Sequence, residues 1–372
     1  MPLTVDDLRR YAVARSLFPP TTLKRALHQM GFVQADPIRA PARAQDLILR
    51  HRVRNYHAGD LERRYHQLGV EEDFFINYGF VTREVQALMH PRLKSRESPW
   101  SFMSAARRKR AQELLEFVRK RDRVHPREVE QHFSHGKVTN YWGGSSNAST
   151  RLLDAMHYQG LLRIVGRQSG IRLYAAYEHG SGPADKAERD ARVDALADLV
   201  VGIYAPLPVR SLNMVIRRLR YAIPQWEREI SRALLRARQR LAHGRVGGID
   251  WYWPAHENPR QSREQEQVRL LAPFDPVVWD RYRFELLWGW TYRFEAYTPV
   301  AKRVRGYYAL PLLWRDRVIG WANLAVEHGR IRADLGYVGL TPPRDPVFQQ
   351  ELAEELARMG QFLKVKGLSR RL

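Results

Sequence analysis

Apolar side chains recur at helical spacing in the segment 104–179. The inner positions of its first helix follow the i, i+3, i+4, i+7 pattern: Ala111, Leu114, Leu115 and Val118. Pro126 is well placed to open a second helix, and a third follows the polar run 143–147. Two apolar runs separated by a turn at 168–170 then predict a β-hairpin. Three helices and a hairpin are typical of a winged helix.

The same order of elements recurs on either side of this segment. After the Gly-rich linker 180–183, helical stripes and a hairpin pattern predict a second such unit, in which Pro208 begins the second helix. At the N-terminus, Thr4 and Asp7 resemble a capped helix start, and a second helix ends at Gly31. The sequence therefore predicts three winged-helix units in tandem.

From about residue 265 the pattern changes to short strands rich in β-branched and aromatic residues. The expected strands are Tyr292–Pro299, Gly306–Trp314, Arg317–Glu327 and Arg330–Val338. Turns are expected at Arg315-Asp316 and His328-Gly329. They predict a small antiparallel β-barrel, closed by a helix over Gln349–Leu363. The predicted fold class is α+β, with three winged-helix units at 1–103, 104–179 and 184–258 and the barrel and helix at 265–372.

The composition limits the cellular locations and the kinds of catalysis that are compatible with this sequence. The 372 residues include no Cys, which excludes disulfides, thiolate catalysis and thiolate metal sites. No apolar run approaches the roughly 20 residues of a membrane span, and the first residues lack the basic and apolar regions of a signal peptide. We expect a cytoplasmic protein that contacts no membrane.

The charge points to a polyanionic partner. The formal net charge is +22 and the pI is about 10.5, in the range where basic surfaces bind phosphate by counterion release. Double-stranded DNA is the expected partner. Most of the basic residues are Arg, which reflects either phosphate recognition or genomic base composition, and a generally basic, well-solvated surface remains the alternative.

One carboxamide and one carboxylate, Gln34 and Asp36, stand just before an arginine-rich stretch. In an extended segment, residues two apart project from the same face, so both side chains could meet one substrate atom. The structural alternative makes Asp36 the N-cap of a helix with Pro37 at its first position. Pro41 weakens that alternative, because it would fall at the fifth helical position and remove a hydrogen bond.

Two groups of residues are candidates for DNA contacts. The first follows the Gln34 segment, and the second lies at or near the third helix of the segment 104–179, which usually meets nucleic acid in winged helices. The candidates are Arg43, Arg50, His51, Arg52, Arg54, Trp142, Asn147, Ser149, Thr150 and Arg151. His132 and His135 lack an obvious third ligand nearby, so neither a metal nor a cofactor is expected.

Four local strings and the order of the parts resemble the AlkZ/YcaQ (AlkX) family of bacterial DNA glycosylases. The strings are Phe32-Val33-Gln34-Ala35-Asp36 with the segment 43–52, Leu271-Ala272-Pro273-Phe274-Asp275-Pro276-Val277-Val278-Trp279-Asp280-Arg281, Tyr292-Arg293-Phe294-Glu295-Ala296-Tyr297, and Gly306-Tyr307-Tyr308-Ala309-Leu310-Pro311. The resemblance covers most of the chain, and the second string is its most specific mark.

The resemblance implies a metal-independent enzyme that hydrolyses the N-glycosidic bond of alkylated purines in DNA. Gln34 and Asp36 take the places of the catalytic Gln-x-Gln or Gln-x-Asp pair, and the Asp version is associated with the unhooking of interstrand crosslinks. The chain departs from the motif at Ala35, where a larger apolar residue is usual, and at Pro37. A single chain with three units is expected to act as a monomer on alkylated duplex DNA, whereas the rival function is that of a non-catalytic winged-helix regulator.

Overall fold

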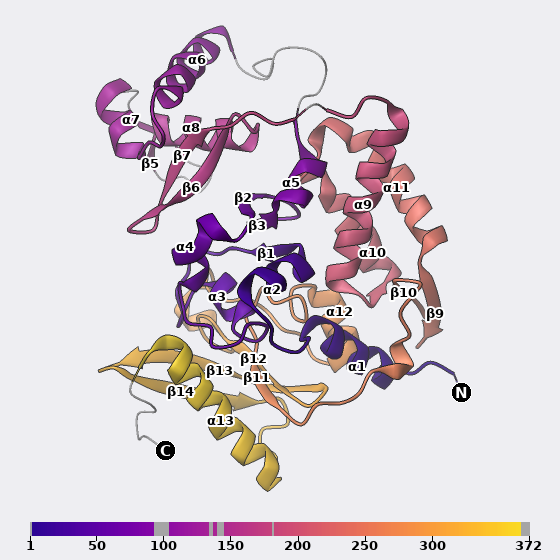
Figure 1. Ribbon diagram of the computed structural model, residues 1–372. Coiled ribbons are helices and arrows are strands. Elements are labelled where there is room, and N and C mark those ends of the chain that lie inside the picture. The colour runs from indigo at the N-terminus through magenta and orange to yellow at the C-terminus, as the bar shows by residue number, and fades with distance from the viewer. Residues whose placement is uncertain (1, 93–103, 134–136, 140–144, 181, 366–372) are drawn as a thin grey trace. The chain divides into compact units, whose positions relative to one another are not determined.

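The structure is a computed structural model that describes residues 2–92, 104–133, 137–139, 145–180 and 182–365 (Figure 1). It divides into two compact units, each assembled from separate stretches of chain. Unit 1 comprises Met1–Leu61, Ala197–Arg217 and Leu234–Leu372, and unit 2 comprises Glu62–Leu196 and Arg218–Ala233. The four smaller domains expected from the sequence stay a prediction.

Unit 1 begins with two capped helices. The first is α1 (Val5–Ser16), whose N-terminus is closed by the reciprocal hydrogen bonds between Thr4 and Asp7 that the sequence predicted. The second, α2 (Leu23–Met30), ends at Gly31 in the left-handed conformation, as expected. The elements that follow in unit 1 are β1 (Phe32–Gln34), α3 (Ala44–Leu49), β8 (Leu207–Pro208), α10 (Val209–Arg217), β9 (Ala242–Val246), β10 (Ile249–Trp253), a 3₁₀ turn (Pro259–Gln261), β11 (Val268–Leu270), α12 (Arg281–Trp288), a 3₁₀ turn (Val300–Lys302), β12 (Leu310–Trp314), β13 (Arg317–Glu327), β14 (Arg330–Tyr337) and α13 (Pro346–Leu363).

An open four-stranded antiparallel sheet in the order β11-β12-β13-β14 occupies the C-terminal part of unit 1. The predicted turns are confirmed, because Arg315 and His328 both adopt positive φ between paired strands. Helix α13 lies against this sheet, where the Phe348 ring meets Trp314 with the ring centroids 5.7 Å apart (Figure 1). The prediction of a closed barrel is not confirmed, since none of the described sheets closes on itself.

The expected strand Tyr292–Pro299 is wrong, because this segment is an irregular loop. Its alternation has another cause: Tyr292 is buried in the core beside Phe284 and donates its hydroxyl to the Ala309 carbonyl at 2.6 Å. Loop side chains that fill a core produce the same apolar spacing as a strand.

Unit 2 contains the elements predicted for the segment 104–179 and packs them around one core. The faces of its three helices meet the hairpin of β6 (Leu162–Gln168) and β7 (Ile171–Ala176), with Ala111, Leu114, Val118, Leu152 and Met156 all buried. The elements of unit 2 are a 3₁₀ turn (Tyr65–Gln67), β2 (Val70–Phe74), β3 (Tyr78–Thr82), α5 (Arg83–Met89), α6 (Ala105–Arg119), α7 (Pro126–Phe133), β4 (Lys137–Thr139), β5 (Ser145–Asn147), α8 (Ala148–Tyr158), β6 (Leu162–Gln168), β7 (Ile171–Ala176) and 3₁₀ turns at Arg218–Tyr221 and Pro224–Trp226. The order of three helices and a hairpin is as expected, while its designation as a winged helix stays a prediction.

Three of the four boundaries between the units fall within helices, namely α4 (Asp60–Arg64), α9 (Lys186–Tyr204) and α11 (Glu227–Arg240), and the fourth separates α10 from the 3₁₀ turn Arg218–Tyr221. Strand β8 forms a sheet with the two strands that follow α11, in the order β8-β10-β9. Pro208, expected to begin a helix, belongs to strand β8 instead. Within the described ranges, no helix combines the length and the apolar character needed to span a bilayer.

Candidate active site

Strand β1 presents Gln34 at the end of a tight connection from α2. Gly31 makes that connection possible: its φ is +66°, and a Cβ at this position would lie 2.6 Å from the Leu199 side chain. Only glycine accommodates both the left-handed backbone and the close approach. The turn carries Gln34 into the interior, where only 9% of its surface is exposed.

Asp36 follows in an irregular loop and not at the start of a helix, because α3 begins only at Ala44. The capping alternative is therefore wrong. The Asp36 Oδ1 instead accepts the backbone N–H of Ile38 at 2.9 Å, a short-range bond that holds the loop. The Asp36 N–H donates to the Gln45 Oε1 at 3.4 Å, which links the loop to α3. Pro37 is exposed at the bend that follows Asp36.

Trp279 fixes the orientation of the Gln34 carboxamide. Its indole Nε1–H donates to the Gln34 Oε1 at 2.8 Å, and an indole can only donate. This bond identifies the amide oxygen and directs the amide nitrogen away from the indole. The Trp279 ring packs in turn against Tyr204, with the ring centroids 4.9 Å apart. The carboxamide is thus held in one orientation before any substrate binds.

The connection between Glu295 and Gly306 is held by hydrogen bonds and carries Tyr297, and Tyr308 follows it. The buried carboxylate of Glu295 accepts the backbone N–H groups of Val304, Arg305 and Gly306 at 2.8 to 3.1 Å. Gly306 has a φ of +113°, and a Cβ there would lie 2.4 Å from the Asn323 Oδ1. These constraints position the residues on either side of the 295–306 connection.

The negative charge of Asp36 is felt by both Tyr297 and Tyr308. Burial is the main cause that raises the pKa of each phenol, and the Asp36 carboxylate adds to it. The Tyr308 hydroxyl is buried and has no hydrogen-bond partner among the described residues. The Phe294 ring lies beside Tyr308 with the centroids 5.3 Å apart, so an aromatic wall borders the carboxylate.

Asp36 itself is half-buried, and no ion pair neutralises it within the described part of the chain. Burial raises the pKa of Asp36 above its ordinary value of 3.8, while the hydrogen bond from Ile38 lowers it in part. When it is ionised, the group is therefore a carboxylate without a cationic partner in the described part of the chain. Such a charge favours positive charge that develops next to it.

The four strings that marked the family resemblance meet in pairs. Gln34 with Trp279 and Arg52 with Asp275 join the first and second strings. The third and fourth are joined by the Gly306 N–H, which donates to Glu295, and by the Tyr292 hydroxyl, which donates to the Ala309 carbonyl. The model of the AlkZ-like DNA glycosylase family matches residues 27–362. The chain belongs to this family. Membership in this family indicates a DNA glycosylase that acts in DNA repair.

A solved structure has the same fold. The DNA glycosylase AlkZ of Streptomyces sahachiroi superposes with a TM-score of 0.64 over 100% of both chains, at 14% sequence identity. At this identity the likeness concerns the fold alone. Family membership and fold agree with the interpretation drawn from the four strings.

The residues after Asp36 that we expected to contact DNA are mostly buried. Arg52 is fully buried and bound to Asp275, so it cannot reach a phosphate in this conformation. The Arg50 guanidinium is buried against Glu355, and the His51 Nε2 lies 2.9 Å from the Leu270 carbonyl oxygen. Burial, with the charge of Arg50, holds the pKa of His51 well below its usual range. Arg43 is half-buried and Arg54 is exposed.

The second group of expected DNA contacts lies in unit 2. Ser149 is fully buried in α8, which argues against a direct contact, while Thr150 is half-buried and Arg151 is exposed. Asn147 ends β5, and Trp142 lies outside the described residues. Arg54 and Arg151 are therefore the exposed cations that remain from the two groups.

Among the described residues, no cluster of three or more potential metal ligands occurs, and metal independence stays a prediction. His132 stacks on Phe117 with the ring centroids 4.5 Å apart, and His135 lies outside the described residues. This stacking supports a packing role for His132.

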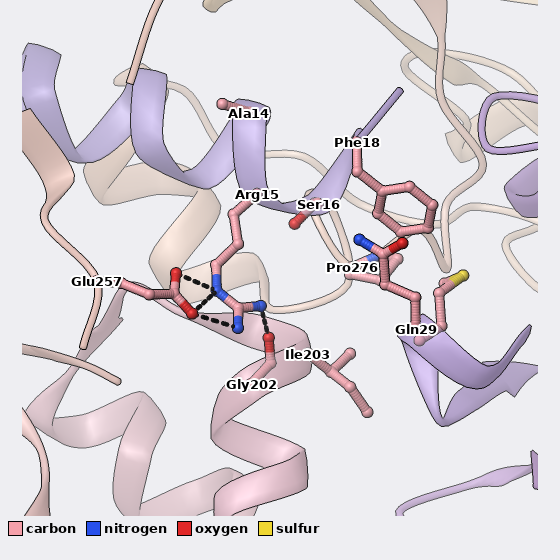
Figure 2. Close-up of a pocket in the computed structure, with 10 residues that line it drawn as sticks. Ala14, Arg15, Ser16, Phe18, Gln29, Gly202, Ile203, Glu257 and Pro276 are labelled. Atoms are coloured by element: carbon pink, nitrogen blue, oxygen red, sulfur yellow. Dashed lines mark hydrogen bonds and ion pairs between the residues drawn. The ribbon is translucent and has the colours of Figure 1, made fainter. Parts of the chain in front are cut away.

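A separate cavity of about 310 Å³ in unit 1 is lined by Arg15 and Glu257 (Figure 2). The Arg15 guanidinium binds both Glu257 oxygens and the Gly202 carbonyl, and the Tyr11 hydroxyl donates to Glu257 at 2.7 Å. These charged groups therefore satisfy one another across α1, α9 and the segment after β10. The arrangement is structural, and Gln34 and Asp36 do not line this cavity.

Sequence reasoning named Gln34 and Asp36 but assigned no role to Trp279, Tyr297 or Tyr308. All three stand in strings that carried the family resemblance. Their conspicuous aromatic character was the only signal, and it does not reveal which side chain meets which.

Replacing Trp279 by Phe is expected to lower the rate of base excision about fivefold. The change removes one hydrogen bond to Gln34 while it keeps an aromatic ring against Tyr204, and a net hydrogen bond contributes about 1 kcal/mol. Single-turnover excision on alkylated duplex measures the effect. In a Gln34→Ala background the same change should have little further effect, because both act through one group. Additive losses would contradict the coupling.

Excision is expected to fall as the pH is lowered through the pKa of Asp36. The group must be ionised to act, and burial raises its pKa above 3.8, so the loss should begin at a higher pH than for an exposed aspartate. Rates of excision at saturating enzyme, corrected for spontaneous base loss, give the profile. The residual excision rate of Asp36→Asn should not fall in this way at low pH. The same fall in that variant would mean that a group other than Asp36 titrates.

Proposed function

We propose that this chain hydrolyses the N-glycosidic bond of N7- or N3-alkylated purines in duplex DNA, and that the unhooking of interstrand crosslinks belongs to the same activity. One observation carries the proposal: an oriented carboxamide and an unneutralised carboxylate, Gln34 and Asp36, come from the same short segment. Family membership supplies the coarse activity.

The chemistry suits these two groups. Alkylation at N7 makes the base cationic, so the bond between C1′ and N9 breaks with its electron pair going to the base and positive charge going to the sugar. The Asp36 carboxylate stabilises that charge and takes a proton from the water that attacks C1′. Gln34 holds the water through its carboxamide. These roles require no metal ion or cofactor.

The aromatic wall gives the damaged base a place to stack. Phe294 is half-buried and Tyr297 is exposed, and their rings, with the centroids 6.1 Å apart, offer faces for stacking near the carboxylate. The exposed cations Arg54 and Arg151 are proposed to contact DNA phosphates. We propose a monomeric enzyme, since both catalytic groups come from one chain. We also propose that it is cytoplasmic, because a chain without Cys suits a reducing compartment.

The experiment that tests this function measures free 7-methylguanine released from methylated duplex DNA by the purified protein in the presence of EDTA. We expect release with an abasic site left in the strand. The rival function, a non-catalytic regulator, predicts binding that weakens with salt but no release. Binding without release would therefore overturn the proposal.

A further inference from the structure

A basic cavity lies at the far end of α3 from the Gln34 segment. It has a volume of about 610 Å³ and is lined by residues of unit 1 that come from the end of α3, from β11 and from α13. Its charged lining consists of Arg50, Arg54, Arg269, Arg358 and Glu355. Four guanidinium groups thus face one carboxylate.

Glu355, the carboxylate that lines the cavity, already accepts hydrogen bonds from three partners in the protein. Glu355 accepts hydrogen bonds from Arg50, from the Leu270 N–H at 2.9 Å and from the Arg358 Nε at 3.2 Å. Arg358 also approaches Glu354, outside the lining, at 3.5 Å. Arg50 and Arg358 are therefore compensated within the protein, and the remaining excess charge belongs to Arg54 and Arg269.

Arg269 is the unusual member of this set. Only 5% of its surface is exposed, and its Nη2 donates to the Gln265 Oε1 at 2.7 Å. Its Nη1 is buried and has no hydrogen-bond partner among the described residues, and no carboxylate there forms an ion pair with it. Burial lowers the pKa of Arg269 to about 10, so the group stays charged at neutral pH. Buried guanidinium groups normally form an ion pair and have an acceptor for each nitrogen, whereas Arg269 forms no ion pair among the described residues and its Nη1 has no acceptor there.

The cavity is large enough for a small organic molecule. Arg54 stands at its exposed rim, and Asn55, Gln267 and Gln361 add carboxamides that can bind polar edges. An anion with several acceptor oxygens would satisfy the Arg269 Nη1 and neutralise the excess charge.

We propose that this cavity is a phosphate-binding site in which Arg269 and Arg54 hold the phosphate group of a nucleotide or of a DNA backbone. The site is separate from Gln34 and Asp36, which precede α3, whereas the cavity begins at Arg50 after its last residue. It therefore does not depend on the proposed catalysis.

The test measures binding of inorganic phosphate to the full-length protein by titration calorimetry at constant ionic strength. We expect saturable binding by the parent protein, and at least a tenfold higher Kd for Arg269→Gln. Arg54→Gln should raise the Kd severalfold and, because Arg54 is exposed, should not disturb folding. Arg245→Gln is the matched control, since Arg245 is an exposed arginine of unit 1 that does not line the cavity.

Competition then distinguishes the two sources of phosphate. Displacement of phosphate by an undamaged duplex supports the DNA backbone as ligand, whereas displacement by deoxyguanosine monophosphate alone supports a free nucleotide. Absence of phosphate binding by the parent, or an unchanged Kd in both Arg269→Gln and Arg54→Gln, would overturn the site. Asp36→Asn should bind phosphate like the parent, so this test fails or succeeds independently of the proposed glycosylase activity.

Discussion

Replacing Asp36 by Asn is expected to slow the release of 7-methylguanine from alkylated duplex by roughly a hundredfold or more. The change removes the charge that stabilises the sugar cation and the base that activates water. It keeps the shape of the side chain and an oxygen that can still accept the Ile38 N–H. Single-turnover excision with enzyme in excess isolates the chemical step from product release.

We expect the Asp36→Asn substitution to have little effect on the stability of the fold. Asp36 forms no ion pair within the described chain, and its loop bond to Ile38 survives in the variant, so the melting temperature and the affinity for undamaged duplex should stay close to those of the parent. Gln34→Ala should cost less than Asp36→Asn, because positioning of water is only part of the barrier. Full excision by Asp36→Asn would remove Asp36 from the mechanism.

The second large effect concerns stability. Asp275→Asn is expected to lower the free energy of unfolding of unit 1 by about 3–5 kcal/mol, because it leaves a buried guanidinium uncompensated. Arg52 and Asp275 are both fully buried and bind through two parallel contacts of 2.8 and 3.0 Å. Arg52 also donates to the Ser16 and Ile48 carbonyls, so it ties α1 and α3 to the loop before α12.

An exposed pair in the same unit provides the control for this prediction. Arg332 and Asp334 approach to 3.5 Å in β14 with about half or more of each side chain exposed, so Asp334→Asn should change stability by less than about 1 kcal/mol. Denaturant unfolding of both variants gives the comparison. Equal losses in the two would contradict the distinction between buried and exposed pairs.

Local patterns in the sequence predicted much of the fold. The capping box at Thr4, the left-handed Gly31 and the buried stripe of α6 are all governed by residues a few positions apart, and all three are confirmed. The prediction of a strand at Tyr292–Pro299 was wrong because its apolar spacing does not have a local cause. Its spacing is imposed by Tyr292 and Glu295 through partners distant in sequence, which no local pattern contains.

At the candidate site too, contacts between residues distant in sequence could not be predicted. The sequence singled out Gln34 and Asp36 by residue type, but not Trp279, which lies 245 positions beyond its partner. Arg52 was expected on a DNA-binding surface because arginines are usually exposed, yet it is fully buried. A buried arginine becomes recognisable only when its partner Asp275 is known.

The measurement that bears most directly on the central claim follows both products of one reaction. Parent protein and Asp36→Asn are incubated with methylated duplex under single-turnover conditions, and free 7-methylguanine and abasic strands are quantified in the same samples. The proposed function predicts equal amounts of the two products from the parent, and a rate at least about a hundredfold lower from an equally stable variant. No base release by the parent, or equal rates for both proteins, would contradict it.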